Sequence, residues 1–526
     1  MRNKWMVRVL MCLLILCMIL PLTVACKKNK GPQDDTSGNV TLPAESTEGE
    51  GKNDNLELPE GLNFNGKEFV IKSMVQTTDV DREFGAEITG TTGDVIDDAV
   101  FNRNESVKAL LNCKIRSDEE IGDTNGTNNS VITAFQTAAS AGTAADAGFH
   151  IGVTAGFRMV TPAYSGQLAN LKSIADLRLD KDYYSQGYNT ALSIGNSQYL
   201  LTGKMSLGYY RYMMINVFNK NMFKQYGIEE PYQMVLDGKW TFEAMANIAK
   251  KIYVDNGTEQ GVKDEGDTYG YFIGVGTGKS HTDGFMSAAN LRVLSKDENN
   301  YYKIEINQAA YADAIDEILK LINAEGTYTK SGGYGPGSVK FKAQQAAMVT
   351  TRMHTLENPD MIEAGNIGDG YGILPLPKAS EEQIDYVSYA QDQCFLFGIP
   401  VVYGKDELIQ IGQFLEAYSW ASYHQVKPKY YDVALTARYV SDENSTAMLE
   451  IIDSKVYVDP VNVYLTSGFN SFTTSTLRSI YATNNEGDVT LASTLAAAIN
   501  GGGLQAQVDE MNERYQKIEN DRATLQ

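Results

Sequence analysis

Several residue types are scarce in this chain, and each shortage excludes a class of protein. Among 526 residues there are 5 Cys, 4 His and 3 Trp, which excludes a disulfide-rich scaffold. Basic residues number 45 against 66 acidic ones, for a net charge of −21. This balance excludes a general nucleic-acid binder, because attraction to phosphates needs a basic surface. Only the extreme N-terminus is apolar enough to enter a membrane, which excludes a polytopic transporter.

Catalytic and cofactor motifs are also missing. The sequence has no Gly-x-Ser-x-Gly, no His-Glu-x-x-His and no Cys-x-x-Cys, and its four histidines show no metal-ligand spacing. Residues 274–280 (GVGTGKS) lack the first glycine of a P-loop, since Ile273 stands there, and are predicted to form a surface loop. The acids of residues 255–267 miss the EF-hand spacing. We expect a solvated loop there, with a calcium site as the open alternative. We predict no cofactor and no metal.

The N-terminus carries an export segment. Residues 9–25 are uncharged and follow Arg2, Lys4 and Arg8, the pattern of a secretory signal peptide. The run ends at Cys26 and resembles the lipobox of bacterial lipoproteins, although Thr23 departs from the family's usual Leu. The resemblance implies a signal peptide over residues 1–25 and a lipid on Cys26. The alternative is an uncleaved anchor, for which the run is short. Both place the remaining chain outside the cytoplasm.

Residues 26–61 form the next compositional segment. They are rich in Lys, Asn, Gly, Asp, Glu, Ser and Thr, which predicts a flexible tether. Two cysteines lie beyond it, Cys113 and Cys394. We favour two buried thiols, and the alternative is one disulfide.

From residue 66 the sequence reads as an α/β body. A helix is predicted over residues 311–322, with Gly326 as its stop, and another over residues 504–518. Strands alternating with helices predict largely parallel sheets. The predicted strands are short apolar runs: Phe69–Ile71, Ile151–Val153, Met213–Phe218, Ala347–Thr350, Tyr371–Leu376 and Cys394–Ile399.

Two tryptophans receive opposite predictions. Trp240 precedes Thr241, a good helix N-cap, and pairs with Met245 in the positions of a hydrophobic staple. This pattern favours a core residue. Trp420 lies on the side of a helix opposite to its apolar stripe, so we expect it to be exposed.

Four motifs occur in the order found in a known family. They are Asn219-Lys220, Asp237–Thr241, Phe341–Met348 and Tyr371–Lys378. With them the chain resembles extracellular solute-binding protein family 1, the receptors of ABC-type importers, mostly for sugars and oligosaccharides. The resemblance implies a two-lobed, periplasmic-binding-protein-like fold of class II type, whose hinge the chain crosses more than once. It implies one lobe of residues 66–207 plus 385–426 and another of residues 208–384 plus 427–526.

A ligand site between the lobes follows from this fold. Open α/β sheets bind ligands beyond their strand ends, and tyrosine, of which there are 31, suits a sugar because it pairs an apolar face with a hydroxyl. The alternative for each tyrosine is a structural role. We therefore predict ligand-binding residues next to strand ends and hinge crossings: Phe157, Arg158, Tyr209, Tyr210, Arg211, Arg352, His354, Gln391 and Asp392.

The resulting hypothesis is a non-catalytic receptor, held at the outer face of the cell membrane by its lipid. It would capture a neutral solute, such as a mono- or oligosaccharide, and deliver it to ABC permease subunits. We expect a monomer that binds no nucleic acid. Two alternatives are a surface-anchored glycoside hydrolase, since the sequence offers many carboxylate pairs, and a ligand-binding partner of a membrane sensor.

Overall fold

The structure is a computed structural model, and it describes residues 52–76, 83–85, 90–124, 126, 128–275, 281–331, 334–357, 370–436, 443–464, 469 and 503–523. The predicted signal peptide, Cys26 and residues 276–280 of the P-loop-like segment lie outside these ranges. None of the described helices has the length and apolar character needed to cross a membrane.

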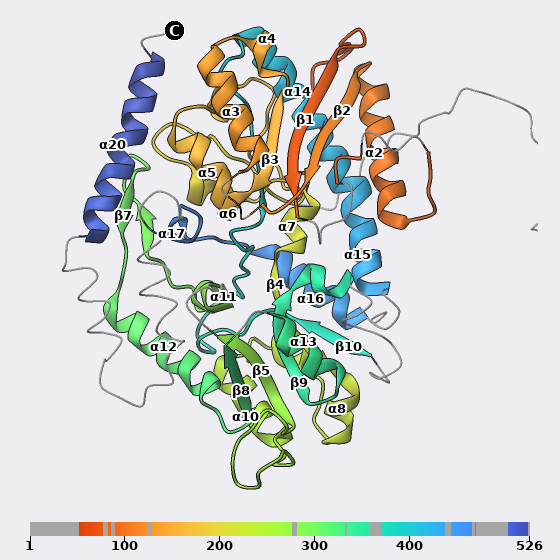
Figure 1. The fold of residues 1–526 in the computed structure, drawn as a ribbon, viewed down its shortest axis with the longest axis vertical. Helices are drawn as coiled ribbons and strands as arrows, with labels where there is room; N and C mark the ends of the chain where they lie inside the picture. Colours follow the sequence, from red (N-terminus) through yellow and green to blue (C-terminus); the bar gives the residue numbers. More distant parts are fainter. Residues whose placement is uncertain are drawn as a thin grey trace, which may run out of the picture. The chain divides into compact units, whose positions relative to one another are not determined.

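The first sheet has four strands in the order β11-β3-β1-β2. Strand β1 (Glu68–Val75) pairs in parallel with β2 (Lys114–Ile121) and β3 (Ile151–Ala155). The fourth strand, β11 (Phe395–Gly398), is antiparallel to β3. The helices that accompany this sheet include α2 (Val95–Leu111), α3 (Ser130–Ala141) and α5 (Gly156–Tyr164), drawn in orange and yellow in Figure 1.

The second sheet has five strands in the order β10-β4-β9-β5-β8. They are β4 (Met214–Asn219), β5 (Tyr269–Val275), β8 (Thr327–Ser331), β9 (Ala346–Arg352) and β10 (Tyr371–Leu374). Strand β5 is parallel to β8 and β9, whereas β4 is antiparallel to β9 and β10. The prediction of largely parallel sheets holds for the first sheet, apart from β11, and is wrong for the second, where two of the four strand pairs are antiparallel. Strands such as β11 and β4 enter their sheet from the other sheet, so a right-handed βαβ crossover does not fix their direction.

The remaining elements are short helices, one hairpin and three longer helices near the C-terminus. They are α4 (Ala144–Ala147), η1 (Leu171–Ser173), α6 (Gln186–Leu192), α7 (Leu207–Arg211), α8 (Lys220–Gln225), α9 (Tyr232–Leu236), α10 (Phe242–Ile252), α11 (His281–Ala288), β6 (Leu294–Lys296), β7 (Tyr302–Ile304), α12 (Gln308–Ile322), α13 (Tyr334–Lys342), η2 (Met353–Glu357), α14 (Lys405–Ala421), the π-helix η4 (Ser422–Val426), α15 (Lys427–Thr436), α16 (Glu443–Ser454), α17 (Pro460–Val463) and α20 (Gly503–Ala523).

The six predicted strands are confirmed, and so is the core position of Trp240, which is fully buried with its indole N–H donating to the carbonyl of Pro375 at 3.0 Å. Thr241 caps α10 by accepting from the amide of Ala244. Two other predictions are wrong. Trp420 is buried, because α14 is covered on all sides from Ile411 onward. Helix α12 ends at Ile322, as predicted, but its C-cap is Asn323, so Gly326 is not its stop.

Two segments that connect the sheets lie side by side. The amide of Met214 donates to the carbonyl of Tyr389 at 2.9 Å, and the amide of Gln391 donates to the carbonyl of Tyr212 at 3.0 Å. Met213 and Ala390 form an antiparallel bridge between them. One segment leads into β4 and the other into β11, so the chain crosses from sheet to sheet more than once, as predicted.

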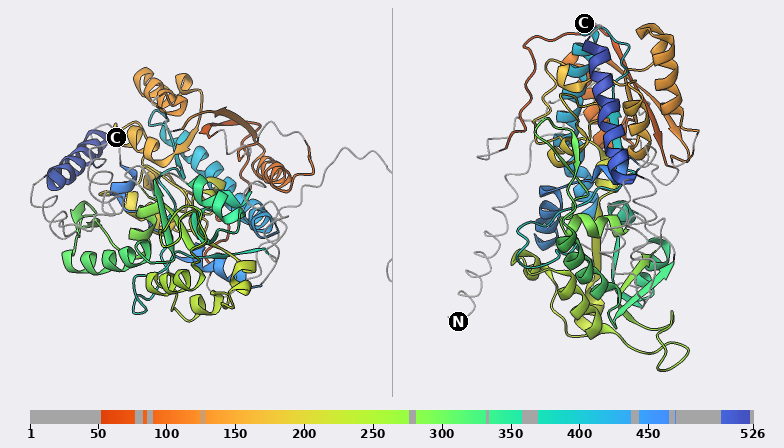
Figure 2. Two further views of the ribbon diagram at one scale, coloured as in Figure 1. Left: turned by 60° about the horizontal axis from the view of Figure 1, so that its bottom comes forward. Right: turned by 90° about the vertical axis from the view of Figure 1, so that its left-hand side faces the viewer.

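The N- and C-terminal parts of the described chain both contact residues between β3 and β4. Asn53 bonds to Asp182 (2.9 Å), so the segment predicted to be a tether is docked from this residue onward. Helix α20 lies beside the C-terminal end of α5, where Arg514 donates to the carbonyl of Tyr164 at 2.8 Å (Figure 2). The lobe boundaries remain a prediction.

Candidate functional site

The predicted ligand-binding residues converge on the two connecting segments. Gln391 and Asp392 lie in the segment that leads into β11, and their neighbours come from both sheets. The amide of Phe157, in the first turn of α5, donates to the carbonyl of Asp392 at 3.0 Å. The guanidinium of Arg352, at the end of β9, lies 3.5 Å from the side-chain oxygen of Gln391. Residues far apart in the sequence, on the first and second sheets, thus meet at one place.

Arg352 is held at the centre of this place by two amides and a ring. Its Nη1 donates to Oε1 of Gln393 at 2.9 Å as well as to Gln391. Its guanidinium carbon lies 5.3 Å from the centre of the Tyr212 ring, within cation–π range. Arg352 and Gln393 are both partly exposed.

His354 completes the second-sheet side of the site. Its Nδ1 lies 3.3 Å from the carbonyl oxygen of Arg211, and its ring lies 5.9 Å from that of Tyr212. Burial and the charge of Arg352 lower the pKa of His354 to about 3. The imidazole is therefore neutral at physiological pH and donates through Nδ1 to that carbonyl, which leaves Nε2 as an acceptor.

Tyr209, Tyr210 and Arg211 lie deeper than the other predicted residues. All three are at most 2% exposed. The Tyr209 hydroxyl donates to Ser185 at 3.1 Å, and the Tyr210 ring lies 5.8 Å from that of Tyr430. In this conformation these side chains therefore pack the connection between the sheets, beneath the partly exposed residues Phe157, Arg158, Arg352 and His354.

Arg211 forms a bidentate ion pair that the sequence did not indicate. Its Nε and Nη2 donate to the two carboxylate oxygens of Glu357 at 3.1 and 2.7 Å. The hydroxyl of Tyr430, on α15, donates to the same carboxylate at 2.7 Å. Such a pair joins α7, η2 and α15 at the connection between the sheets, and a bidentate geometry fixes their relative orientation.

Sequence reasoning missed Tyr212, Glu357 and Gln393. Gln393 lies in a turn, in which the amide of Cys394 donates to the carbonyl of Gln391 at 2.7 Å, so no strand alternation linked it to the candidate Gln391. Glu357 carried no signal either, since its partner lies 146 residues away.

Taken together, the site combines the partly exposed side chains of Phe157, Arg158, Arg352 and Gln393 with the buried side chain of Gln391. Arg158 and Arg352 supply donors, Gln391 and Gln393 supply amides, and Phe157 supplies an aromatic face. Paired donors and acceptors beside an aromatic ring suit a neutral polar ligand with several hydroxyl groups. Among the described residues no group of His, Cys, Asp and Glu is arranged to hold a metal ion.

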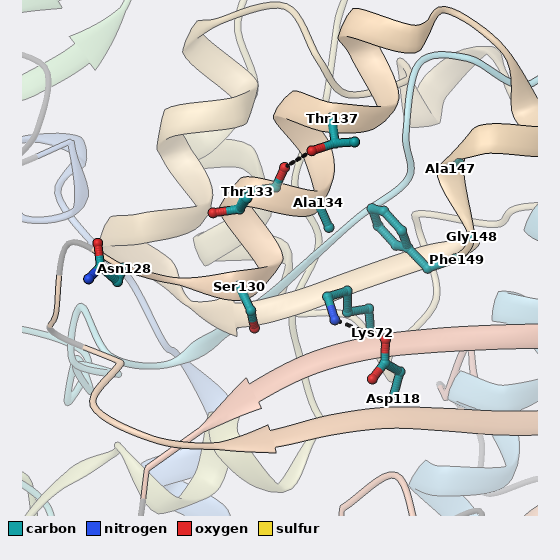
Figure 3. Close-up of a pocket in the computed structure, with 10 residues that line it drawn as sticks. All are labelled: Lys72, Asp118, Asn128, Ser130, Thr133, Ala134, Thr137, Ala147, Gly148 and Phe149. Atoms are coloured by element: carbon teal, nitrogen blue, oxygen red, sulfur yellow. Dashed lines mark hydrogen bonds and ion pairs between the residues drawn. The ribbon is translucent and has the colours of Figure 1, made fainter.

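Two hollows in the described surface lie elsewhere. The first, of about 600 Å³, lies between the faces of β1 and β2 and helix α3, with the ion pair Lys72–Asp118 on its floor and Ser130, Thr133 and Thr137 on its wall (Figure 3). The second, of about 790 Å³, lies between the N-terminal parts of α10 and α12 and residues 379–383. Neither includes a predicted site residue.

The acidic loop of residues 255–267 uses its carboxylates internally. Asp267 is fully buried and accepts from the amides of Asn256 and Gly257 at 3.0 and 2.7 Å. Asp264 accepts from the hydroxyl of Thr258 at 2.5 Å and from the amides of Gly266 and Thr258 at 2.6 and 2.8 Å, and these bonds lower its pKa to about 2. The expectation of a merely solvated loop is wrong for Asp267, because the loop folds around that carboxylate. Cys113 and Cys394 are both buried free thiols, as favoured.

The fold and the sequence both identify the family of this chain. Two α/β sheets joined by adjacent crossing segments define a two-lobed binding-protein fold. The chain belongs to the bacterial extracellular solute-binding protein family, whose profile matches residues 114–390. It is an extracellular solute-binding protein. No curated protein matches the chain.

Solved structures are similar to this chain at low sequence identity. A sugar transporter from Rhizobium etli, in an open conformation, is 13% identical with a TM-score of 0.51, covering 85% of this chain and 99% of that one. The GacH receptor of Streptomyces glaucescens is 12% identical with a TM-score of 0.47, covering 86% and 98%. A substrate-binding protein from Listeria monocytogenes is 14% identical with a TM-score of 0.47, covering 86% and 99%.

Proposed function

We propose that this protein is a lipid-anchored, non-catalytic receptor that binds a neutral mono- or oligosaccharide where the two lobes meet and delivers it to an ABC permease. The family to which the chain belongs supports the receptor role. The Rhizobium etli protein of the same fold is described as a sugar transporter, and this favours a carbohydrate among the possible solutes.

One observation carries the choice of site. The residues selected from strand ends in the sequence meet between elements of both sheets: the side chain of Arg352 lies 3.5 Å from that of Gln391, and the backbone amide of Phe157 donates to the carbonyl of Asp392. A ligand that touches both groups of residues in a closed state stabilises that state over an open one. The proposed mechanism is therefore capture by closure, with Arg352 and the Gln391–Gln393 amides donating to and accepting from hydroxyl groups.

A thermal-shift screen of the full chain tests the proposal. The panel holds neutral mono- and oligosaccharides, with amino acids, short peptides, polyamines and nucleosides as other solute classes. A sugar at 100 times its dissociation constant should stabilise the protein by about 2.7 kcal/mol. A shift with another class alone would overturn the carbohydrate assignment. Small-angle scattering with the sugar should show compaction, and an unchanged profile would contradict closure.

Turnover distinguishes the receptor from the enzyme alternative. The bound sugar should be recovered intact after long incubation, and release of shorter products would identify a glycan-acting enzyme. A permease gene pair beside this gene would support import, whereas a neighbouring sensor-kinase gene would support a sensing role.

The lipid anchor has its own test. In Cys26→Ser, labelled fatty acid should no longer be incorporated, while the melting temperature of the globular body stays the same. Unchanged incorporation in this variant would contradict the anchor, without affecting the proposed ligand site.

A further inference from the structure

Lys181 is a lysine whose side chain has no exposed surface at all. A buried ammonium costs free energy unless each of its N–H groups finds an acceptor. All three acceptors come from the N-terminal segment: Oδ1 of Asn53 at 3.0 Å, Oδ1 of Asn55 at 2.7 Å and Oε1 of Glu57 at 2.7 Å. An ammonium has three donors, so Lys181 is fully satisfied by this segment.

The spacing of these acceptors shows how the segment is recognised. Residues 53, 55 and 57 alternate, so in an extended chain their side chains share one side. Asp54 points the other way, is 5% exposed, and its carbonyl lies 3.2 Å from Nε2 of His424 in the π-helix η4. Backbone bonds fix the register, because the amide of Asp182 donates to the carbonyl of Asn53 at 2.9 Å and the Asn53 amide donates to the Asp182 carboxylate at 2.9 Å.

The region that receives the segment is itself firmly held. Tyr184, three residues after Lys181, donates to the buried carboxylate of Glu416 on α14 at 2.8 Å, and Tyr183 donates to the same carboxylate. The amide of Arg178 donates to Glu416 at 3.1 Å. The segment is thus bound to a rigid part of the body.

We propose that residues 53–57 form a strap that fastens the N-terminal segment to the first lobe through the ammonium of Lys181. Any pull transmitted along that segment then acts on the first lobe at Lys181, and the second lobe is left free to move in closure. This consequence rests on the proposed anchor and closure, but the docking of the strap does not. The part of the predicted tether that follows residue 52 is thus docked on the body.

Amide hydrogen exchange in the full chain tests the strap. In Lys181→Met, the amides of Asn53 and Asp182 should exchange at least about tenfold faster than in the wild type, since hydrogen bonds to a charged group are lost. Lys172→Met, which alters an exposed lysine, is the matched control and should leave both rates unchanged. Unchanged rates in Lys181→Met would overturn the proposal. If Lys181→Met does not fold, Asn55→Ala should still accelerate exchange at both amides.

A double-mutant comparison provides a second test, in which Lys181→Met should change the melting temperature in opposite directions in two backgrounds. Lys181→Met alone should lower the melting temperature, because the strap loses its partner. In the Asn55→Ala/Glu57→Ala background, where the ammonium is left buried without two of its acceptors, Lys181→Met should raise the melting temperature. A further decrease in that background would show that Lys181 serves only local packing and would overturn the strap. Neither result depends on ligand binding, so failure here is distinguishable from failure of the proposed function.

Discussion

The carboxylate of Glu357 accepts two hydrogen bonds from the guanidinium of Arg211, at 3.1 and 2.7 Å, and so connects the helix before β4 with the helix after β9. The side chain of Arg211 is 3% exposed and that of Glu357 is 21% exposed. This pair therefore combines a buried cation with a partly solvated anion. Because solvent screens the anion, the pair contributes less to the free energy of unfolding than a fully buried pair of the same geometry would.

Removal of the cation should reduce stability. In Arg211→Ala the free energy of unfolding should fall by about 2–4 kcal/mol, because Glu357 stays charged beside an empty space. Tyr430→Phe, which removes one hydrogen bond to the same carboxylate, should cost about 1 kcal/mol. Urea unfolding measures both, with Lys250→Ala, at an exposed pair, as a control that stays within about 0.5 kcal/mol. Weaker sugar binding with an unchanged free energy of unfolding would instead place Arg211 in the ligand site.

Arg352 should affect binding more than stability. Its guanidinium is partly exposed and is held by Gln393 and Gln391. Arg352→Ala should weaken sugar binding by roughly 5- to 150-fold, the equivalent of about 1–3 kcal/mol for a lost donor. Gln393→Ala should have a smaller effect, because it frees the guanidinium without removing it. Calorimetry with a sugar from the screen measures both, and wild-type affinity in Arg352→Ala would contradict the site assignment.

Sequence patterns predicted the fold better than they predicted which of the candidate site residues are buried. Short apolar runs identified the six strands because buried strands need apolar residues on both faces. Strand β2, with the sequence KIRSDEEI, was missed because it is an edge strand with mostly charged, exposed residues. Arg352 and Gln391, both chosen for their positions next to strand ends, do lie together, at 3.5 Å, and their role in ligand binding stays a prediction. The burial of Tyr209 and Tyr210 was not predictable, since it depends on Tyr430 and other residues brought in from more than 200 positions away.

Gly326 illustrates how a glycine signal was assigned to the wrong cause. It was expected to end α12, but a Cβ on Gly326 would lie 2.0 Å from the carbonyl oxygen of Ala249 in α10. The glycine is needed because the α10 backbone approaches closely. Gly326→Ala should lower the free energy of unfolding by about 1–3 kcal/mol through overpacking.

A second glycine serves as the matched control for that prediction. A Cβ on Gly337, in helix α13, would meet its nearest neighbour, Phe272, at an ordinary 3.5 Å. Gly337→Ala should be neutral or stabilising by up to about 1 kcal/mol, because alanine favours the helix. Thermal and urea unfolding should show that Gly326→Ala lowers the free energy of unfolding relative to the wild type, whereas Gly337→Ala does not. Equal stability of Gly326→Ala and the wild type would show that α10 shifts without cost.

The last prediction concerns pH and the buried carboxyl group of Glu83. This side chain is 2% exposed, and its oxygens accept from the amides of Leu207 and Gly208, at 3.0 Å each, where α7 begins. The backbone carbonyl of the same residue accepts from Arg103 at 2.7 Å. Burial outweighs these bonds and raises the pKa of Glu83 to about 7.

The sign of the effect on stability follows from that raised pKa. Between about pH 4.5 and pH 7 the folded protein binds more protons at Glu83 than the unfolded chain does, so the free energy of unfolding falls as the pH rises. The loss is complete above pH 7 and amounts to about 3 kcal/mol for a pKa raised from 4.5 to about 7.

Glu83→Gln cannot titrate and should lack this contribution. The difference between wild type and Glu83→Gln in urea unfolding should therefore decrease from pH 4.5 to pH 7.5. Glu416, whose pKa is also raised to about 7 by burial, is present in both proteins and cancels. A flat or rising difference for Glu83→Gln would show that this carboxyl group stays ionised in the folded protein.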